Sequence, residues 1–218
     1  MGSTRKTVKA LIFDFDGLMV DSESPGFRAW SEIYATYGCS LPFEKYAACI
    51  GTIDGFDLHA YLEEQTARSF DRRELESACN RRWLELMTDQ PLLPGVEACV
   101  CAAKGRGLKL AVASSSTQKW VTRNLKKFAL LEHFDVICTR DFVHAPKPDP
   151  ALYLLALERL DVKAEEAIAF EDSPNGLLAA KRAGLYCVVI PNQLTKELPL
   201  ELADERLNSL EEFSLDHV

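Results

Sequence analysis

Five short, mostly continuous runs of apolar residues restrict the fold of this chain more than any other feature of its sequence. The runs are Val8–Phe13, Leu108–Ala113, Phe134–Cys138, Ala167–Phe170 and Tyr186–Ile190. A run that is apolar throughout, instead of alternating between apolar and polar residues, is typical of a strand buried on both faces of a parallel sheet. The runs therefore predict a sheet that is covered on both sides.

Helical segments separate the last four of these runs, near Lys119–Phe128, Pro150–Leu160 and Pro174–Ala183. Gly184 follows the third segment, at the place where a glycine often ends a helix. Strands that alternate with helices are joined by crossover connections, which give parallel pairing. We therefore expect an α/β fold with a doubly wound parallel sheet of the Rossmann type.

A long insertion interrupts this alternation, because 94 residues lie between Phe13 and Leu108, whereas a simple crossover needs about a dozen. Helical periodicity marks four segments within it: Ser22–Tyr37, Pro42–Cys49, Phe56–Ala67, and a helix that begins at Asp71–Glu74 and runs toward Met87. We predict a small helical cap domain at residues 22–91, inserted into an α/β core of residues 1–21 and 92–218. Its hinges are expected near Val20–Ser24 and Asp89–Pro94.

Polar side chains follow the predicted strands, at the points where the strands end. The positions are Asp14 and Asp16 after the first run, Ser114 after the second, Lys147 in the Pro-rich loop after the third, and Glu171 and Asp172 after the fourth. Open α/β sheets bind ligands at the carboxyl ends of their strands. We therefore expect these side chains to lie together in one site.

Clustered carboxylates on fixed loops are typical of Mg²⁺ sites, because this hard cation prefers oxygen ligands. One carboxylate of such a cluster can attack phosphorus and form an acyl phosphate. A lysine and the metal ion can neutralise the transferring phosphoryl group, while a hydroxyl group donates a hydrogen bond to it. An aspartate two residues after the nucleophile can act as general acid and base.

These residues resemble the four motifs of the haloacid dehalogenase superfamily, in the same order and at suitable spacing. Asp14-Phe-Asp16-Gly17 resembles the first motif, Ser114 the second, Lys147 the third and Glu171-Asp172 the fourth, and the insertion resembles the small helical cap of the family. The resemblance extends from Val8 to about Asn192.

The resemblance implies a role for each of these residues. Asp14 is expected to be the nucleophile and a metal ligand, and Asp16 the general acid and base, with its backbone carbonyl also on the Mg²⁺. Asp172 is expected to be the remaining metal ligand. The family's dehalogenases and phosphonate hydrolases lack an aspartate at the position of Asp16, whereas its phosphatases and phosphomutases keep it.

The other three motif residues are expected to act on the phosphoryl group or to support the metal site. The resemblance implies that Ser114 and Lys147 bind the phosphoryl group. It also implies that Glu171 contacts the metal ligands without binding the metal ion itself. Several of the motif residues also have a purely structural interpretation, and Asp14 and Asp16 could form a turn after the strand. Ser114 and Asp172 are placed to cap the following helices, and Lys147 could be a solvated charge on its loop.

The sequence leaves three functions open. The first is a phosphatase that hydrolyses a small phosphorylated metabolite through an aspartyl-phosphate. The second is a β-phosphoglucomutase-like isomerase, because Phe27-Arg-Ala-Trp30 resembles the start of the cap in that subfamily. The mutases place a histidine just before this stretch, where this chain has Gly26, and this favours the phosphatase. The third is a catalytically silent binding protein, which the intact motif residues disfavour.

Cap residues are expected to select the substrate, notably near Gly51–Gly55 and at Arg81-Arg82. The tryptophans Trp30, Trp83 and Trp120 lie in helical segments and are interpreted as packing residues.

Composition and charge limit the partners and the compartment. The net charge of −8 and a pI near 5.1 argue against nucleic acid or an anionic membrane as a partner, because both attract basic surfaces. No apolar stretch approaches the 18 or so residues of a membrane span. Seven cysteines without a CxxC pair predict buried free thiols in a reducing compartment. We therefore expect a cytoplasmic, monomeric enzyme.

Overall fold

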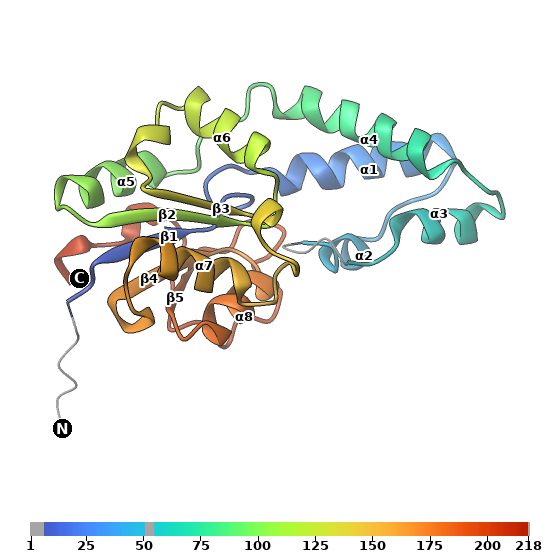
Figure 1. Ribbon diagram of the computed structural model, residues 1–218. Coiled ribbons are helices and arrows are strands. Elements are labelled where there is room, and N and C mark those ends of the chain that lie inside the picture. The colour runs from blue at the N-terminus through green and yellow to red at the C-terminus, as the bar shows by residue number, and fades with distance from the viewer. Residues whose placement is uncertain (1–6, 51–54, 218) are drawn as a thin grey trace.

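The structure, a computed structural model, describes residues 7–50 and 55–217, and its centre is a parallel sheet (Figure 1). The strands are β1 (Ala10–Phe13), β2 (Lys109–Ser114), β3 (Val136–Thr139), β4 (Ala167–Glu171), β5 (Tyr186–Val189) and β6 (Glu205–Arg206). They lie in the order β3-β2-β1-β4-β5-β6, and all neighbouring pairs are parallel. This confirms the α/β fold class and the five predicted strands. The sequence did not indicate β6, because its two charged residues contain no apolar run.

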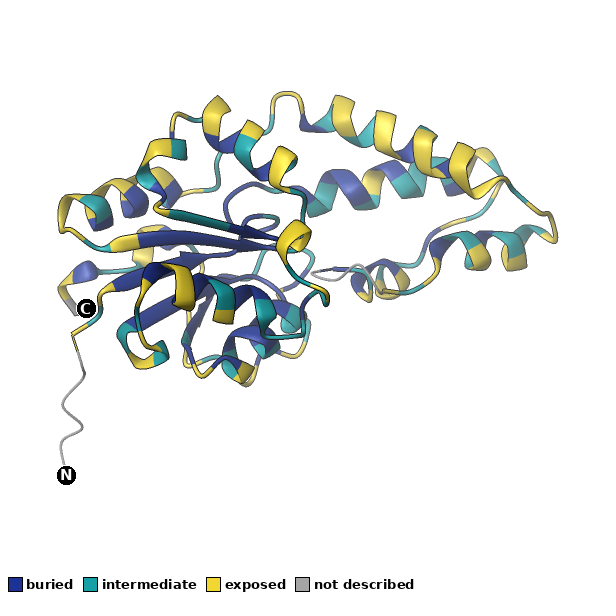
Figure 2. Ribbon diagram, in the orientation of Figure 1, coloured by how far each residue is buried: buried dark blue, intermediate teal, exposed yellow. Residues whose placement is uncertain are grey.

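Helices cover both faces of the sheet. They are α5 (Val96–Gly105) and α6 (Gln118–Lys127) on one face, and α7 (Ala151–Leu160) and α8 (Pro174–Arg182) on the other (Figure 1). Short 3-10 turns occur at Leu131–His133, Arg140–Phe142, Ala164–Glu166, Leu210–Glu212 and Leu215–His217. Figure 2 shows the resulting pattern, with a buried sheet and exposed outer faces of the helices.

Alternate residues of the five predicted strands enter different hydrophobic cores, which explains why the runs are apolar throughout. In β1, Leu11 and Phe13 pack toward α5 and α6, whereas Ala10 and Ile12 pack toward α7 and α8. Successive side chains of a strand point to opposite faces of the sheet, and here both faces are covered. A strand in this position therefore has no solvent-facing residues that could be polar.

Four further helices form a separate group beyond the carboxyl ends of the strands (Figure 1). They are α1 (Glu23–Thr36), α2 (Phe43–Ala47), α3 (Leu58–Thr66) and α4 (Arg72–Met87). The group has its own hydrophobic cluster, in which Tyr34 and Leu62 are fully buried. Asp57 and Asp71 begin α3 and α4 by accepting hydrogen bonds from backbone amides of the first helical turn. We call this group the helical layer; it occupies the region predicted to be a cap domain.

The two segments that connect the helical layer to the sheet run side by side. Val20 and Leu92 form an antiparallel bridge, and the amide of Leu93 donates a hydrogen bond of 2.9 Å to the carbonyl of Met19. Both predicted hinges therefore lie at one place. Movement of the helical layer about these segments remains a prediction.

All seven cysteines are free. Cys79, Cys99, Cys138 and Cys187 are buried as expected, and Cys39 and Cys49 are half-buried. Cys101 is exposed on α5, so the prediction of buried thiols is wrong for Cys101. Among the described residues, no helix is both long and apolar enough to cross a membrane.

Candidate active site

The predicted site residues meet at the carboxyl end of the sheet. Asp14 follows β1, Ser114 ends β2, and Glu171 and Asp172 lie at the end of β4. Because these strands are neighbours in a parallel sheet, their ends lie at one edge. Lys147 reaches the same place from the loop between β3 and α7. All five of these side chains are buried.

Lys147 joins two of the carboxylates. Its Nζ atom lies 2.5 Å from Oδ1 of Asp14 and 2.7 Å from Oε1 of Glu171. The hydroxyl of Tyr153 also donates a hydrogen bond to Glu171 Oε1. Burial by itself would lower the pKa of Lys147, but the charges of Asp14 and Glu171 and their hydrogen bonds outweigh it and raise the pKa. Lys147 is therefore a cation throughout the physiological range.

Burial raises the pKa of the two aspartates. The pKa of Asp14 is raised to about 8 by burial, against the effect of Lys147 and together with the negative charges of Glu171 and Asp16. The pKa of Asp172 is also well above its ordinary value, first through burial and then through the charges of Asp14 and Glu171. The raised pKa values mean that the three carboxyl groups cannot all ionise beside one ammonium group, and a divalent cation would allow them to do so.

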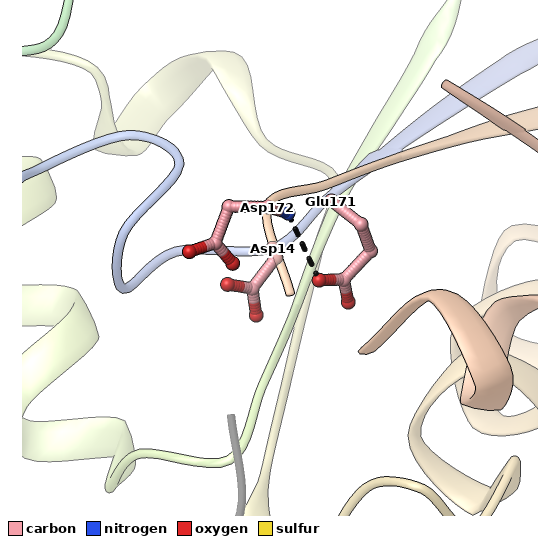
Figure 3. A group of neighbouring side chains, drawn as sticks. All are labelled: Asp14, Glu171 and Asp172. Atoms are coloured by element: carbon pink, nitrogen blue, oxygen red, sulfur yellow. Dashed lines mark hydrogen bonds between the residues drawn. The ribbon is translucent and has the colours of Figure 1, made fainter. Parts of the chain in front are cut away.

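The geometry of the three carboxylates fits a hard metal ion. Asp14, Glu171 and Asp172 each offer an oxygen, and these oxygens all lie within 4.8 Å of one another. Figure 3 shows the carboxylates of Asp14 and Asp172 next to each other, with that of Glu171 on the far side of Asp14. Mg²⁺ is bound in proteins by oxygen ligands, usually one or two carboxylates together with water and substrate phosphate.

Glu171 differs from the two aspartates because both of its oxygens already accept hydrogen bonds. Oε1 accepts from Lys147 and Tyr153, and Oε2 accepts from the amide of Asp172 at 3.3 Å. Within residues 7–50 and 55–217, by contrast, no hydrogen bond reaches Oδ2 of Asp14 or Oδ1 of Asp172. This agrees with a supporting role for Glu171 and leaves the aspartate oxygens free to bind an ion or a substrate.

Asp16 lies at the edge of this cluster and is partly exposed. Its Oδ2 accepts a hydrogen bond of 3.3 Å from Ser114 Oγ, and its Oδ1 accepts one of 2.9 Å from Nε1 of Trp120. The next residue, Gly17, has a φ of +82°, and a Cβ atom there would lie 2.2 Å from Oδ2 of Asp172. Only glycine allows the chain to turn at this point while Asp172 keeps its place.

A cavity of about 220 Å³ lies between the sheet and the helical layer. Asp14, Asp16, Ser114 and Lys147 are part of its wall, and the helical layer and its linker contribute Ser22, Glu23, Tyr46, Cys49 and Trp83. The remaining wall residues are Ser115, Ser116, Arg140 and Ser173. A ligand held here would therefore contact both parts of the molecule.

Several site residues carried no signal in the sequence. Glu23 lines the cavity at the start of α1, where burial and then the charges of Asp16, Asp14 and Asp21 raise its pKa to about 8. Tyr153 and Asn192 bind Glu171 and Asp172 from positions distant in the sequence. The interpretation of Trp120 and Trp83 as packing residues is incomplete, because Trp120 also binds Asp16 and Trp83 lines the cavity.

Two parts of the cap were predicted to select the substrate, and only one of them lies fully within the described residues. Arg82 pairs with Glu32 at 2.6 Å and with Glu85 at 2.9 Å, and neither it nor Arg81 lines the cavity. The two arginines are therefore not placed to contact a ligand there. Most of the predicted loop Gly51–Gly55, residues 51–54, lies outside the described residues.

Comparisons with known proteins agree with this architecture. The family model described as haloacid dehalogenase-like hydrolase matches residues 11–190, from β1 to the end of β5. The Bacillus subtilis protein YhcW, which is provisionally named a phosphatase, is 46% identical over 95% of this chain and 94% of its own length. The phosphorylated carbohydrates phosphatase of Thermotoga maritima is 34% identical over 82% of each chain.

A solved structure extends the comparison to three dimensions. CbbY from Rhodobacter sphaeroides, determined in complex with phosphate, is 34% identical, covers 94% of this chain and 96% of its own, and superimposes with a TM-score of 0.77. A variant of the same protein was determined in complex with xylulose-(1,5)bisphosphate. With the family model matching most of its length, this chain belongs to the haloacid dehalogenase-like hydrolases.

Proposed function

We propose that the protein is a Mg²⁺-dependent phosphatase that hydrolyses a small phosphorylated carbohydrate through an aspartyl-phosphate on Asp14. The observation that carries the proposal is Oδ2 of Asp14, which accepts no hydrogen bond from the described residues and lies beside Lys147 in a cavity between the sheet and the helical layer. The names of the relatives agree with it, since one acts on phosphorylated carbohydrates and another was determined with a sugar bisphosphate.

In the first half-reaction, Asp14 Oδ2 attacks phosphorus while the bond from phosphorus to the sugar oxygen breaks. Asp16 gives its carboxyl proton to that oxygen, so the sugar leaves as a neutral alcohol. Lys147 and Ser114 hold the phosphoryl oxygens. Lys147 also keeps Oδ1 of Asp14 in place, so that the other oxygen faces the substrate.

In the second half-reaction, Asp16 takes a proton from water as the water oxygen attacks phosphorus. The bond from phosphorus to Asp14 then breaks, and inorganic phosphate leaves. Mg²⁺, held by Asp14, Asp172 and the backbone carbonyl of Asp16, would neutralise the phosphoryl charge in both steps. We propose that residues 22–91 form a cap domain that closes to exclude bulk water and opens to release products.

The test combines a substrate panel with trapping of the intermediate. We expect release of inorganic phosphate from one or more sugar or polyol phosphates in a panel that also includes nucleotides and small acid phosphates. Acid quenching should recover a phosphorylated protein that Asp14→Asn cannot form, with turnover lower by about a thousandfold or more. Asp71→Asn is a matched control, because Asp71 caps α4 far from the cavity and asparagine caps helices equally well. Normal turnover by Asp14→Asn would overturn the covalent mechanism.

A further inference from the structure

Trp120 holds the proposed general acid from one side. It lies on α6, outside the four family motifs, and its indole Nε1 donates a hydrogen bond of 2.9 Å to Oδ1 of Asp16. The other oxygen, Oδ2, accepts from Ser114 Oγ at 3.3 Å. The carboxyl group of Asp16 is therefore fixed at both oxygens by residues of the core.

A second indole connects this contact to the helical layer. Trp83 of α4 packs on Trp120, with ring centroids 4.5 Å apart and an angle of 44° between the rings. Its own Nε1 donates a hydrogen bond of 3.0 Å to the carbonyl of Ser22, in the segment that enters the helical layer. A continuous line of contacts thus runs from the connecting segment through Trp83 and Trp120 to Asp16.

The chemistry of indole also determines which oxygen of Asp16 can carry a proton. Nε1–H of tryptophan is a donor only, so Oδ1 of Asp16 must be an acceptor while the contact exists. When Asp16 is protonated, this contact favours the proton on Oδ2, where the hydrogen bond with Ser114 Oγ would then run from Asp16 to Ser114. Ser114 is the residue expected to hold the phosphoryl group, and so the proton faces the reacting atoms.

We propose that Trp120 is a positioning residue that fixes the Asp16 carboxyl group with its transferable proton on Oδ2, and that Trp83 of the helical layer keeps Trp120 in place. The inference rests on the proposed role of Asp16 as general acid. The tryptophan pair would thus make the orientation of the Asp16 carboxyl group depend on the position of the helical layer.

The test uses two kinds of leaving group. A sugar or alkyl alkoxide needs a proton as it leaves, whereas p-nitrophenolate leaves without one, because it is a much weaker base. Trp120→Phe keeps an aromatic ring against Trp83 but removes the donor to Asp16. We expect kcat/KM for the best sugar phosphate to fall on the order of tenfold, the effect of losing one hydrogen bond, and kcat/KM for p-nitrophenyl phosphate to stay nearly unchanged.

Asp16→Asn separates the failure of the inference from the failure of the proposed function. If Asp16→Asn impairs only the sugar phosphate while Trp120→Phe changes neither substrate, Asp16 is the acid and the inference is wrong. If Asp16→Asn shows no dependence on the leaving group, the acid role fails and the inference fails with it. Equal losses for both substrates in Trp120→Phe would show a merely structural role and overturn the inference.

An isosteric replacement guards against a folding defect in Trp120→Phe. Benzothienylalanine at position 120 has sulfur in place of Nε1–H and the same shape, so it should reproduce the selective loss. Trp30→Phe is the matched control, because Trp30 packs against His59 within the helical layer and should leave both substrates unaffected. The inference would be contradicted if Trp30→Phe lost sugar phosphate turnover, or if the benzothienylalanine variant kept it.

The role of Trp83 is tested by a double-mutant cycle and by fluorescence. Trp83→Leu should cause a similar selective loss in the wild-type background but little further loss in Trp120→Phe. The chain has three tryptophans, so in Trp30→Phe the tryptophan fluorescence comes only from Trp83 and Trp120. The fluorescence emission of this variant should change when a phosphate analogue binds. Independent losses in the cycle, or unchanged emission on saturation with the analogue, would exclude the coupling.

Discussion

Lys147 Nζ lies 2.5 Å from Oδ1 of Asp14, and both side chains are buried beneath the helical layer. The same ammonium group is 2.7 Å from Glu171, so one cation compensates two buried carboxylates. This arrangement orients the nucleophile. It also means that the stability of the folded protein depends on Lys147, a residue expected to bind substrate.

Lys147→Met should therefore lower stability as well as activity. The change leaves Glu171 buried without its cation, whereas Asp14, with a pKa of about 8, can take up a proton. Breaking a buried ion pair in this way costs about 3 to 5 kcal/mol of the free energy of unfolding. Chemical denaturation followed by circular dichroism measures the loss, and phosphate release measures turnover. Unchanged stability would mean that the carboxylates are neutral or otherwise compensated in the native protein.

Lys104→Met is the matched control for this experiment. Lys104 pairs with Asp135 at 2.7 Å, but both side chains are more than a third exposed, and exposed pairs contribute about 1 kcal/mol or less. Turnover should be unaffected because Lys104 lies on α5, away from the cavity. A loss as large as that of Lys147→Met would show that burial is not the cause.

Removal of the metal should abolish turnover, and Mg²⁺ should restore it. Without the ion, the pKa of Asp14 is about 8 and that of Asp172 is also raised, so the nucleophile is largely protonated. Mg²⁺ would lower both pKa values and keep Asp14 ionised. Mg²⁺ at a hundredfold excess over its dissociation constant should stabilise the folded protein by about 2.7 kcal/mol, and by much less in Asp172→Asn. Thermal unfolding with and without the ion measures the difference. Turnover that resists EDTA would contradict the metal site.

Glu23 should make the metal-free protein less stable as the pH rises. Its pKa of about 8 in the folded protein exceeds the ordinary value near 4.5, so the folded state retains a proton that the unfolded state loses. The free energy of unfolding therefore falls between about pH 4.5 and pH 8. Burial is the main cause of the shift, and the charges of Asp16, Asp14 and Asp21 add to it, against a weak hydrogen bond from Tyr46.

Glu23→Gln should remove the part of this dependence that Glu23 causes, while the raised pKa values of Asp14 and Asp172 leave a dependence of the same sign. We expect the variant to match the wild type near pH 4.5 and to exceed its stability by on the order of 2 kcal/mol at pH 8, because Glu23 keeps some contact with solvent. Urea denaturation in EDTA across this range measures the difference. Glu44→Gln, at an exposed position on α2, should show no such trend, and a constant difference for Glu23→Gln at all pH values would refute the assignment.

The sequence predicted the strands and the motif residues because their signals are local. An apolar run followed by Asp14 or by Glu171-Asp172 can be recognised without knowing the fold, since parallel strand ends meet at one edge. Trp120 and Tyr153 gave no such signal. Their roles depend on which helix side chain faces a strand end, and an aromatic residue on a helix is equally consistent with ordinary packing. The positions of Arg82 and Glu23 were likewise decided by packing between α1 and α4 and between α1 and α2.

The last prediction is hydrolysis to water in preference to transfer of the phosphoryl group back to a sugar. Both reactions share the aspartyl-phosphate, so Asp14 and Asp16 cannot select between them. The β-phosphoglucomutases that this chain resembles place a histidine at the position of Gly26. In the structure, a Cβ atom at Gly26 would lie 2.2 Å from the hydroxyl oxygen of Tyr46, and this hydroxyl donates a hydrogen bond of 3.3 Å to the carbonyl of Glu23.

Tyr46 therefore occupies the space that a side chain at position 26 would need, and a histidine could enter only if Tyr46 moved. Position 26 thus supplies no imidazole to relay a proton near Asp16, and we expect the phosphoenzyme to react with water. The deciding assay supplies β-glucose 1-phosphate with a trace of the 1,6-bisphosphate and measures two products. Free phosphate well above glucose 6-phosphate, or no turnover of this sugar, agrees with a phosphatase. Rapid conversion to glucose 6-phosphate with little free phosphate would establish a mutase instead, because the phosphoenzyme would then be protected from water without a histidine at position 26.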